Sequence, residues 1–480
     1  MKRKGKRKAM FFHPVSIITP DSFVLEVTVN ASDTVTLPLK STGTYNFEVN
    51  FGEVSGFSTV TVWNDADASY TYTAGGTYQI VINGVCNRFA VDNTAVRTKF
   101  TDIIQWGNNA FVELNFYGCN KLTAISSTDI LNTISMTSVN SLFKNCSLLV
   151  SVNNINSWDT SGITSFGSTF EGCPLFNQNI TNWNLSSATN LTFMFYGCTI
   201  FNQDVSGWNV ANCTAFFGTF RLCRNFNQNL DSWNVTKGTT FNSMFYECDK
   251  FNQSLNSWVI NSTTPVDMSS MFLGCNIFNG NITSWNTIRV TSMTSMFQSC
   301  PVFNQNIGSW VLTNCTNLGA MFSGATIFNQ DITGWDVSKV TNLATTFINA
   351  ISFNQNIGIW VMPLLNNLNN TFRNATSFNQ DISGWNVSGV TDFRSCFQGN
   401  SAFNQNLSTW DISSATLMQL FGHTSGFSVA NWDAMLNAWA TLPTPPSNII
   451  IDMKPTHSAA ANAAYTTLTT IYSWTINEGI

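Results

Sequence analysis

Residues 194–210 read MFYGCTIFNQDVSGWNV, and close variants of this segment recur along the chain. The triplet Phe-Asn-Gln, with one Phe-Asn-Gly variant, returns every 25 residues except for a single step of 27. The triplets start at Phe176, Phe201, Phe226, Phe251, Phe278, Phe303, Phe328, Phe353, Phe378 and Phe403. Self-similarity at such a period is typical of solenoids built from stacked copies of one unit.

Two further columns of residues keep the same period. The tryptophans are Trp158, Trp183, Trp208, Trp233, Trp258, Trp285, Trp310, Trp335, Trp360, Trp385 and Trp410. The other column holds Cys119, Cys146, Cys173, Cys198, Cys223, Cys248, Cys275 and Cys300, continued by Ala325, Ala350, Ala375 and Asn400. The pattern predicts about twelve turns between residues 110 and 425.

Within one unit the apolar spacing changes. Phe195, Cys198 and Phe201 recur every three residues, which predicts a short helical or 3-10 turn. The alternation of Trp208-Asn209-Val210 predicts a short strand. A unit this small cannot bury its own apolar face, so stacked copies must share one core. The fold class that we predict is a solenoid of short parallel strands and short helical turns.

The repeated pattern is Met-Phe-x-x-Cys-x-x-Phe-Asn-Gln-Asp/Asn-Ile-x-x-Trp-Asn/Asp-Val-Ser-x-Val-Thr. It resembles the repeat of the BspA-like leucine-rich-repeat surface proteins, which is also common in mycoplasma surface lipoproteins. The resemblance covers about two thirds of the chain. It implies a leucine-rich-repeat solenoid used on surfaces for attachment and recognition. The chain departs from the lipoprotein members at its front, where the secretion signal and the lipid-bearing cysteine are missing.

Residues 20–95 have a different sequence pattern, in which strand-like runs are separated by the turn-forming residues Gly, Asn, Asp and Ser. The runs are residues 23–29, 45–51, 58–62 and 77–82. Short strands at this spacing predict a small β-sandwich. The segments Asn50-Phe51-Gly52-Glu53 and 70–78 resemble two landmarks of PKD-type immunoglobulin-like domains, with the acidic turn reduced to Glu53. This domain would serve as a mount for the solenoid.

The last turn of a solenoid needs a lid, because its core would otherwise face water. Residues 427–480 are expected to supply this cap as an α/β segment. Trp432, Leu436 and Trp439 have helical spacing, residues 449–451 predict a strand, residues 459–471 predict a second helix, and residues 474–476 close the chain.

The charge distribution is asymmetric. The basic tail, residues 1–19, contains Lys2, Arg3, Lys4, Lys6, Arg7 and Lys8. The other 15 Lys and Arg residues stand against 26 Asp and Glu, so the rest of the chain carries −11. A body of that sign repels phosphate backbones, which argues against nucleic-acid binding by the folded part. The tail is either solvated or a docking element for an acidic partner.

No apolar run is long enough for a membrane span, and the segment after the tail is too short for a signal peptide. This absence favours a virion protein assembled in the cytoplasm, and hence a virion-surface location. The alternative location is extracellular, on a bacterial cell surface.

Side chains for catalysis or metal binding are scarce in the repeats. Cysteines stacked in one column point alongside each other, and the column accepts Ala, so we predict buried free thiols rather than disulfides or a zinc site. The three histidines, His13, His423 and His457, have no cluster of ligands around them in the sequence. Neither a cofactor nor a metal is predicted, and the protein is not expected to be an enzyme.

One column exchanges Asp with Asn, which indicates a turn or a side-chain ladder rather than a general acid. Its members include Asp204, Asp331 and Asp381 and, elsewhere, Asn179, Asn229, Asn306, Asn356 and Asn406.

The tryptophans are predicted to point inward, because an exposed stripe of indoles would exceed the apolar patch that a soluble protein tolerates. The residue after each tryptophan then points outward. These residues form a polar strip, Asp159, Asn184, Asn209, Asn234, Asn286, Asp336, Asn386 and Asp411, interrupted by Val259, Val311 and Val361. The strip is either a solvated surface or a face that binds extended polymers such as glycans through many weak contacts.

The function expected from the sequence is non-enzymatic surface recognition. A phage fibre or decoration protein that binds a host-cell glycan or protein receptor is one version, and a bacterial adhesin is another. A purely structural capsid or tail decoration, or spacer, is the alternative. Other virion structural proteins would be partners, and self-association into a homo-oligomer is left open.

Overall fold

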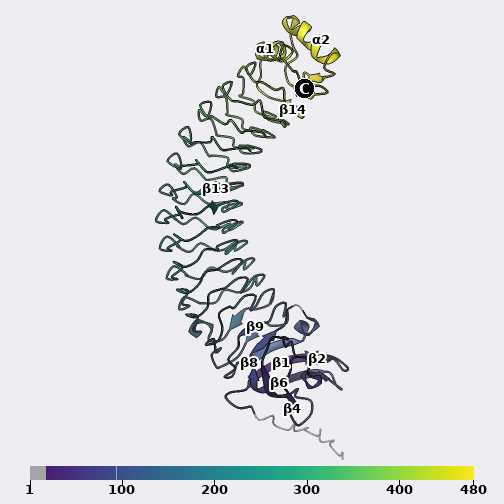
Figure 1. Ribbon diagram of the computed structural model, residues 1–480, viewed down its shortest axis with the longest axis vertical. Coiled ribbons are helices and arrows are strands. Elements are labelled where there is room, and N and C mark those ends of the chain that lie inside the picture. The colour runs from purple at the N-terminus through teal and green to yellow at the C-terminus, as the bar shows by residue number, and fades with distance from the viewer. Residues whose placement is uncertain (1–17, 93) are drawn as a thin grey trace, which may run out of the picture. The chain divides into compact units, whose positions relative to one another are not determined.

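The computed structural model describes residues 18–92 and 94–480. The chain divides into two compact units, Met1–Ser187 and Ala188–Ile480, and both contain turns of a solenoid (Figure 1). Because residues 1–17 lie outside the described part, so does the predicted docking tail with Lys2, Arg3, Lys4, Lys6, Arg7 and Lys8.

The regular elements are short. The first unit holds β1 (Phe23–Val29), β2 (Thr34–Thr36), β3 (Tyr45–Asn50), β4 (Ser58–Val60), η1 (Ala66–Ala68), β5 (Ser69–Thr71), β6 (Gly76–Cys86), β7 (Arg88–Ala90), η2 (Ala95–Thr98), β8 (Phe100–Gln105), β9 (Glu113–Asn115), β10 (Ala124–Ile125), β11 (Ser151–Val152) and η3 (Ile155–Ser157). The second holds β12 (Val266–Asp267), β13 (Val290–Ser292), β14 (Met418–Gly422), α1 (Val429–Trp439), β15 (Ile450–Met453), η4 (Ala459–Ala461), α2 (Asn462–Thr470) and β16 (Thr475–Glu478).

The first unit begins with an antiparallel sheet in the order β4-β3-β6-β1-β8, and β2 pairs with β5 beside it. In β3 the side chains alternate between buried and exposed from Tyr45 onward, as a strand with one face on the core requires. Strands β1, β3, β4 and β6 lie where the sequence predicts strands. The sequence pattern did not indicate β2 or β5.

Parallel pairing begins earlier than the boundary predicted at residue 110. Strand β7 pairs in parallel with β9, although β7 lies inside the range expected for the sandwich. The other edge of β7 is closed by the segment before β3, where Leu39 bridges Phe89 and the Ala90 amide donates to Pro38 at 2.9 Å. No Phe-Asn-Gln triplet marks this first strand, so the sequence repeat could not reveal it.

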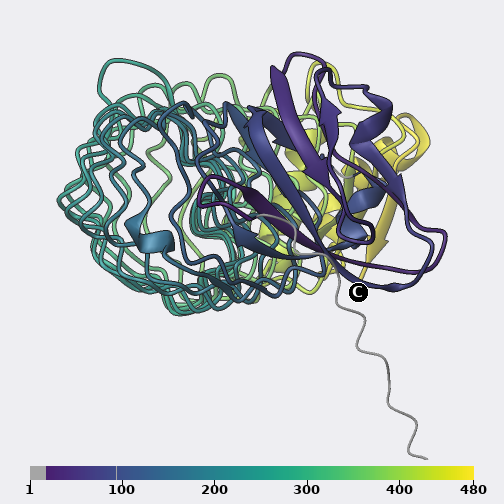
Figure 2. The same ribbon diagram turned by 90° about the horizontal axis from the view of Figure 1, so that it is seen from below.

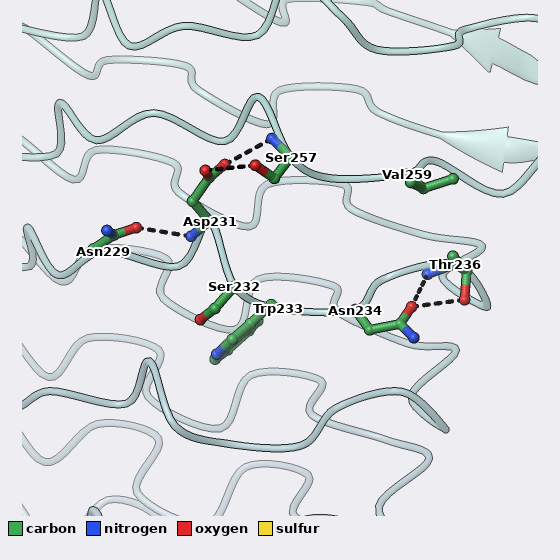
Figure 3. Close-up of a pocket in the computed structure, with 8 residues that line it drawn as sticks. All are labelled: Asn229, Asp231, Ser232, Trp233, Asn234, Thr236, Ser257 and Val259. Atoms are coloured by element: carbon green, nitrogen blue, oxygen red, sulfur yellow. Dashed lines mark hydrogen bonds between the residues drawn. The ribbon is translucent and has the colours of Figure 1, made fainter.

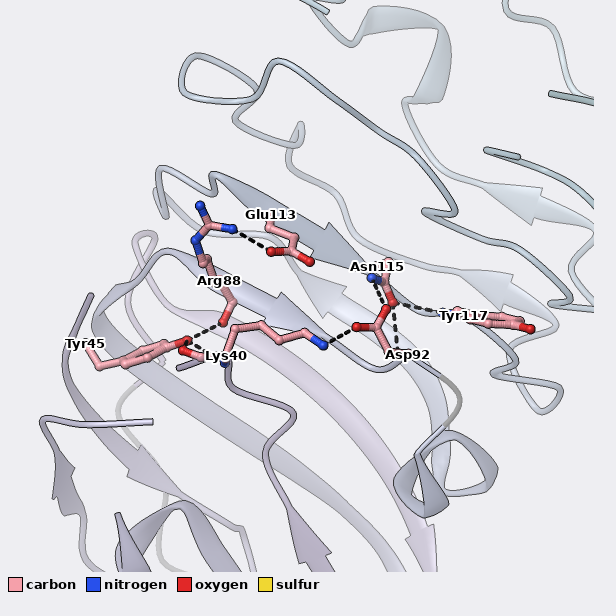
Figure 4. Close-up of polar contacts among 7 residues, drawn as sticks. All are labelled: Lys40, Tyr45, Arg88, Asp92, Glu113, Asn115 and Tyr117. Carbon is pink, nitrogen blue, oxygen red and sulfur yellow. Dashed lines mark hydrogen bonds and ion pairs between the residues drawn. The ribbon is translucent and has the colours of Figure 1, made fainter. Parts of the chain in front are cut away.

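Polar side chains fasten this start of the ladder (Figure 4). The Tyr45 hydroxyl donates to the carbonyl oxygens of Lys40 and Arg88, at 2.9 and 3.0 Å. Across the two parallel strands, Arg88 pairs with Glu113 at 2.6 Å. Asp92 pairs with Lys40 and accepts a bond from the Asn115 amide at 2.8 Å. These bonds satisfy polar groups at a sheet edge that would otherwise be open.

In the second unit the turns stack in one register (Figure 1), and Figure 2 shows the teal and green turns lying over one another. Parallel bridges, with the β12–β13 pair among them, join Asn190, Ala215, Thr240, Asp267, Ser292, Asn317, Asn342, Asn367, Asp392 and Leu417, each to the next. Near each bridge, successive backbone amides donate alternately to the next turn and to a carbonyl within their own turn. The amides of Leu191, Phe193 and Phe195 donate to the next turn, whereas those of Met194 and Tyr196 close tight turns within their own.

The positions of the predicted strand and helical turn therefore need correction. Over Trp208–Val210, where a strand is expected, the described backbone forms none, and the bridges fall elsewhere in the repeat. The Asn209 side chain accepts a bond from the Ala211 amide and so bends the chain directly after the tryptophan. The helical turn predicted around Cys198 is a run of tight turns, because every second amide is bonded to the neighbouring turn.

Each turn also contains two left-handed residues, four positions apart. Examples are Ser270 with Gly274 and Asn370 with Asn374, at φ values of 57° and 74°, and of 55° and 57°. Gly and Asn, which adopt this conformation at low cost, predominate at the second of these positions, whereas Ser is the commonest residue at the first.

The Phe-Asn-Gln triplet builds a ladder along one edge of the second unit. The Asn329 amide donates to Asn304 Oδ1 at 3.0 Å, and Asn329 Oδ1 accepts from the Asn354 amide at 2.9 Å. The Gln355 side chain adds bonds to the carbonyl oxygen and to Oδ1 of Asn329, both at 2.9 Å. The same pattern links Asn202, Asn227, Asn252, Asn279, Asn304, Asn329, Asn354, Asn379 and Asn404.

The C-terminal segment 427–480 prolongs the parallel ladder. Strands β14, β15 and β16 pair in parallel, and α1 and α2 connect them. Helix α1 buries Trp432, Leu436 and Trp439, the residues whose spacing predicts it. Its start replaces a turn of the asparagine ladder, because the Ser428 amide and Asn431 Nδ2 donate to Asn404 Oδ1 at 2.7 and 2.9 Å.

Glu53 ties two loops of the antiparallel sheet together. Its carboxylate accepts the amides of Thr73 and Ala74, both at 2.8 Å, and the Tyr70 hydroxyl at 2.9 Å. These hydrogen bonds, with that of the Thr73 amide the strongest contributor, lower the pKa of Glu53 from 4.5 to about 2.

The asparagine ladder leads to a first prediction. Asn329→Ala removes the acceptor of the Asn354 amide, whereas Asn329→Asp keeps an oxygen in its place. We expect Asn329→Ala to lower the stability of this turn by about 1 kcal/mol. Hydrogen exchange at the Asn354 amide should then become about fivefold faster. Equal exchange in the Ala and Asp variants would show that the ladder bond contributes nothing.

The Glu53 clasp leads to a second prediction. Because the pKa is depressed in the folded state, its contribution is fully present above pH 4.5 and is lost as the pH falls toward about 2. Hydrogen exchange at the Thr73 and Ala74 amides, corrected for intrinsic rates, should lose protection over that range. Glu53→Gln should remove this pH dependence, and protection that persists at pH 2 in the native chain would contradict the mechanism.

Candidate binding surface

The polar strip predicted from the sequence is exposed throughout. Asp159 and Asn184 belong to the first unit, and Asn209, Asn234, Asn286, Asp336, Asn386 and Asp411 belong to the second. Each follows a tryptophan that is at most 4% exposed, so the inward orientation predicted for the indoles is confirmed. Val259, Val311 and Val361 interrupt the strip and are 61%, 39% and 72% exposed.

Every residue of the strip also shapes its own turn. The Oδ1 atom accepts a bond from the amide two residues later, at 3.0 to 3.1 Å in all eight positions. At Asn234 the Thr236 hydroxyl adds a second bond to the same oxygen at 2.7 Å. Figure 3 shows the Asn234 amide nitrogen turned away from Thr236. The fold therefore uses one oxygen of each of these exposed side chains, and at Asn234 the other polar atom points away from the turn that the oxygen closes.

The three aspartates of the strip are held in their charged form. The hydroxyls of Ser161, Ser338 and Ser413, followed by the backbone amides of the same serines, lower the pKa of the carboxyl groups that they contact. Those carboxyl groups are Asp159, Asp336 and Asp411. The strip thus presents amide donors at some turns and carboxylate acceptors at others.

Shallow hollows lie between neighbouring turns on this face. One, of about 630 Å³, is lined by Asn229, Asp231, Asn234, Thr236 and Ser257, together with the edge of Trp233 (Figure 3). Asp231 spans the turns there, because its carboxylate accepts the amide and the hydroxyl of Ser257, both at 2.8 Å. A second hollow, of about 610 Å³, lies farther along the unit over the neighbouring column that exchanges Asp with Asn, and Asn306 and Asp331 line it.

The neighbouring column, which exchanges Asp with Asn, has the turn role that the sequence predicts. Its Oδ1 atoms accept from the amide two residues later, at 2.9 Å in Asp204 and Asp381 and at 3.0 Å in Asn406. Either residue supplies that oxygen, which explains the exchange.

The cysteines are buried free thiols, as predicted, and all twelve are unpaired. Burial raises the pKa of Cys86, Cys213 and Cys300 to about 12 and that of Cys315 to about 11. In the repeats the thiol often donates to a backbone carbonyl of the preceding turn, as Cys248 does to Phe220 at 3.0 Å. A thiol with such a pKa is protonated at neutral pH and is a poor nucleophile.

The sequence missed one histidine contact. His457 Nδ1 lies 2.8 Å from Glu478 Oε2, and its Nε2 lies 3.1 Å from Asn462 Oδ1, so strand β16 supplies a carboxylate partner. Within residues 18–92 and 94–480, no group of three or more His, Cys, Asp or Glu side chains is placed to hold a metal ion. None of the helices in the same residues has the length and apolar character needed to cross a bilayer.

Comparison with known proteins identifies the repeats. The family model described as "Mycoplasma protein of unknown function, DUF285" matches four overlapping segments, residues 112–220, 183–276, 266–363 and 352–441. These segments together cover more than half of the chain. A search of curated protein sequences finds no match.

The buried thiols lead to a third prediction. In the native chain, none of the twelve cysteines should react with a thiol reagent such as DTNB within minutes at pH 8, because each is buried and protonated. After unfolding in guanidinium, all twelve should react. Rapid titration of any thiol before unfolding would contradict the packing described for the cysteine column.

Proposed function

We propose that this chain, which belongs to the DUF285 family of mycoplasma proteins of unknown function, is a non-enzymatic surface-recognition protein that binds an extended polymer along its polar strip. The proposal rests on the observation that each strip residue uses the two polar atoms of its side chain differently. One oxygen closes the turn, and the second polar atom is exposed at the same place in successive turns.

A repeating row of weak contacts suits a repeating ligand. Each turn offers one amide or carboxylate, and single contacts of this kind are weak in water. A polymer that follows the stacking direction makes many of them at once, so that its affinity rises with its length. The hollows are shallow and open, which suits a chain lying across the turns better than a small molecule that must be enclosed.

The charge of the chain favours a neutral ligand. Apart from the basic tail, the chain carries −11, and the strip aspartates are ionised. Polyanions such as nucleic acids are repelled by such a surface. A neutral polysaccharide offers hydroxyl groups that both accept from amides and donate to carboxylates, and is therefore the ligand class that we propose.

The same proposal includes an identity for the repeat, for the antiparallel sheet and for the C-terminal segment. The repeat would be a variant of the BspA-like leucine-rich-repeat type, which the recurring Phe-Asn-Gln and tryptophan columns support. The antiparallel sheet would be a PKD-like mount, supported by the clasp that Glu53 forms with the loop after β5. The segment 427–480 would cap the stack, supported by the burial of Trp432 and Trp439 in α1.

Display on a surface has two versions. On a virion, the protein would be a phage fibre or decoration that binds a host glycan or protein receptor. On a bacterial cell, it would be an adhesin. Antibody labelling of purified particles and of intact cells from the source distinguishes the two.

A purely structural role is the second candidate function. It is favoured by the fact that the Oδ1 atoms of the strip, the asparagine ladder and several threonine hydroxyls of the repeats form bonds within the chain. Thr316, for example, donates to the carbonyl of Thr291. In that case the partner is the particle itself, and deletion of residues 1–10 should abolish incorporation if the basic tail is the docking element.

The strip itself leads to a fourth prediction. The double variant Asn209→Asp/Asn234→Asp keeps the oxygens that close the turns but replaces two outward amide donors with carboxylate oxygens. We expect it to stay folded and to bind a neutral polysaccharide at least about tenfold more weakly than the native chain. The measurement is biolayer interferometry on immobilised dextran, mannan, galactan and arabinogalactan.

The matched control is Asn225→Asp/Asn366→Asp, which adds the same charge at two exposed positions outside the strip. It should bind as the native chain does. Binding by neither the native chain nor any variant, or equal binding by both double variants, would remove the recognition proposal and favour the structural role.

A further inference from the structure

A second surface, in the first unit and lined by no residue of the polar strip, has the features of a ligand site. It is a depression of about 760 Å³ beside the pair of strands β2 and β5. Its floor is apolar, with Leu37, Pro38 and Val96, and its rim carries the polar side chains of Thr36 and Asp65 among others. The two hollows described in the solenoid have a smaller apolar share in their lining.

Trp63 stands at this depression and is unlike every other tryptophan of the chain. Its side chain is 49% exposed, whereas the other fifteen tryptophans are at most 4% exposed. Val62 beside it is 50% exposed. Leaving an indole in water forgoes the stabilisation that burial would supply, and exposed apolar surface of this kind commonly marks a binding site.

The polar groups at the rim are held in fixed positions. The Ser69 hydroxyl donates to Thr36 Oγ1 at 2.7 Å, so the Thr36 hydroxyl proton stays available to a ligand. Asp65 accepts the amides of Asp67 and Thr61 at 3.2 and 3.3 Å, which orients its carboxylate at the N-terminus of η1. Asn64 also lines the depression and forms no side-chain hydrogen bond to any residue that the structure describes.

We propose that this depression binds one sugar residue of a glycan, with the pyranose ring stacked on the Trp63 indole. A pyranose has an apolar face of C–H groups and a rim of hydroxyls, and the depression presents the matching pair, an aromatic face and polar atoms beside it. The hydroxyls of the sugar accept from Thr36 and Asn64 and donate to Asp65. This site is separate from the polar strip and does not depend on the function proposed for it.

Other ligand classes fit the lining less well. No Lys or Arg lies among the residues that line the depression, so a phosphate or another anion would meet only Asp65. An acyl chain would leave the hydroxyls and the carboxylate of the rim without partners, which is costly. A sugar satisfies both the indole and the rim.

The test uses the full-length chain and a panel of hexasaccharides: maltohexaose, mannohexaose, cellohexaose and chitohexaose. Because the other tryptophans are buried, a bound sugar should protect Trp63 selectively, and iodide quenching of the tryptophan fluorescence should fall as the sugar is added. Isothermal titration calorimetry gives the affinity. At least one hexasaccharide is expected to bind with both signals.

Trp63→Ala should weaken binding of that sugar at least about tenfold, and Trp63→Phe should restore part of it. Thr36→Val keeps a β-branched residue in β2 and removes only the hydroxyl, so it should weaken binding several-fold without loss of the fold. Val85→Ala is the matched control, because Val85 is 50% exposed in the same unit and does not line the depression.

Two results would overturn the proposal. One is the absence of binding by all four hexasaccharides. The other is binding that Trp63→Ala leaves unchanged. The double variant Asn209→Asp/Asn234→Asp separates this site from the polar strip, since it should bind hexasaccharides as the native chain does even where its binding to long polysaccharides is lost.

Discussion

A buried indole N–H is costly to leave unpaired, and in the repeats from Trp233 to Trp410 its acceptor is the same backbone carbonyl of the preceding turn at each step. From Trp233 to Trp410, eight consecutive tryptophans make this bond at 2.7 to 3.3 Å. The bond fixes the register of each turn against the preceding turn, because a shifted turn would leave a buried N–H donor unpaired. It also survives the two-residue insertion. Asn261 folds the extra residues into an exposed loop by accepting the amides of Thr263 and Thr264, and Trp285 still reaches Leu255 at 2.7 Å.

The period of the sequence was sufficient to predict a solenoid with inward tryptophans and free thiols, since columns of large apolar side chains and of small thiols are stable in water only as a shared core. It was not sufficient to locate the bridges between turns. Those form at Asn190, Ala215 and Thr240, where the side chains differ and only the backbone is common. The start of the ladder was missed for the same reason, because β7 joins it through main-chain bonds without a triplet to mark it. The turn-closing role of the strip was also hidden, since a period-two pattern cannot distinguish a strand residue from one that bends the chain.

Asparagine and aspartate can replace each other without changing the fold, but they offer opposite hydrogen-bonding groups to a ligand. Both close the turn through one oxygen, as Asn386 and Asp411 do in neighbouring turns. The remaining atom is a donor in one and an acceptor in the other. A single exchange therefore alters what the surface recognises with little cost to stability. The use of uncharged polar groups also explains the low proportion of charged residues, 10%, because amides and hydroxyls supply the hydrogen bonds that hold the turns together.

The direction of the bonds between turns has a mechanical consequence. The bridges, the asparagine ladder and the indole bonds all run from one turn to the next. Together they form the junction between two turns, and tension applied along the stack acts on every such junction. Rupture of one junction frees a single repeat of 25 residues, which can extend by about 85 Å before the next junction carries the load. We therefore expect a stack of this kind to yield one repeat at a time under such a pull.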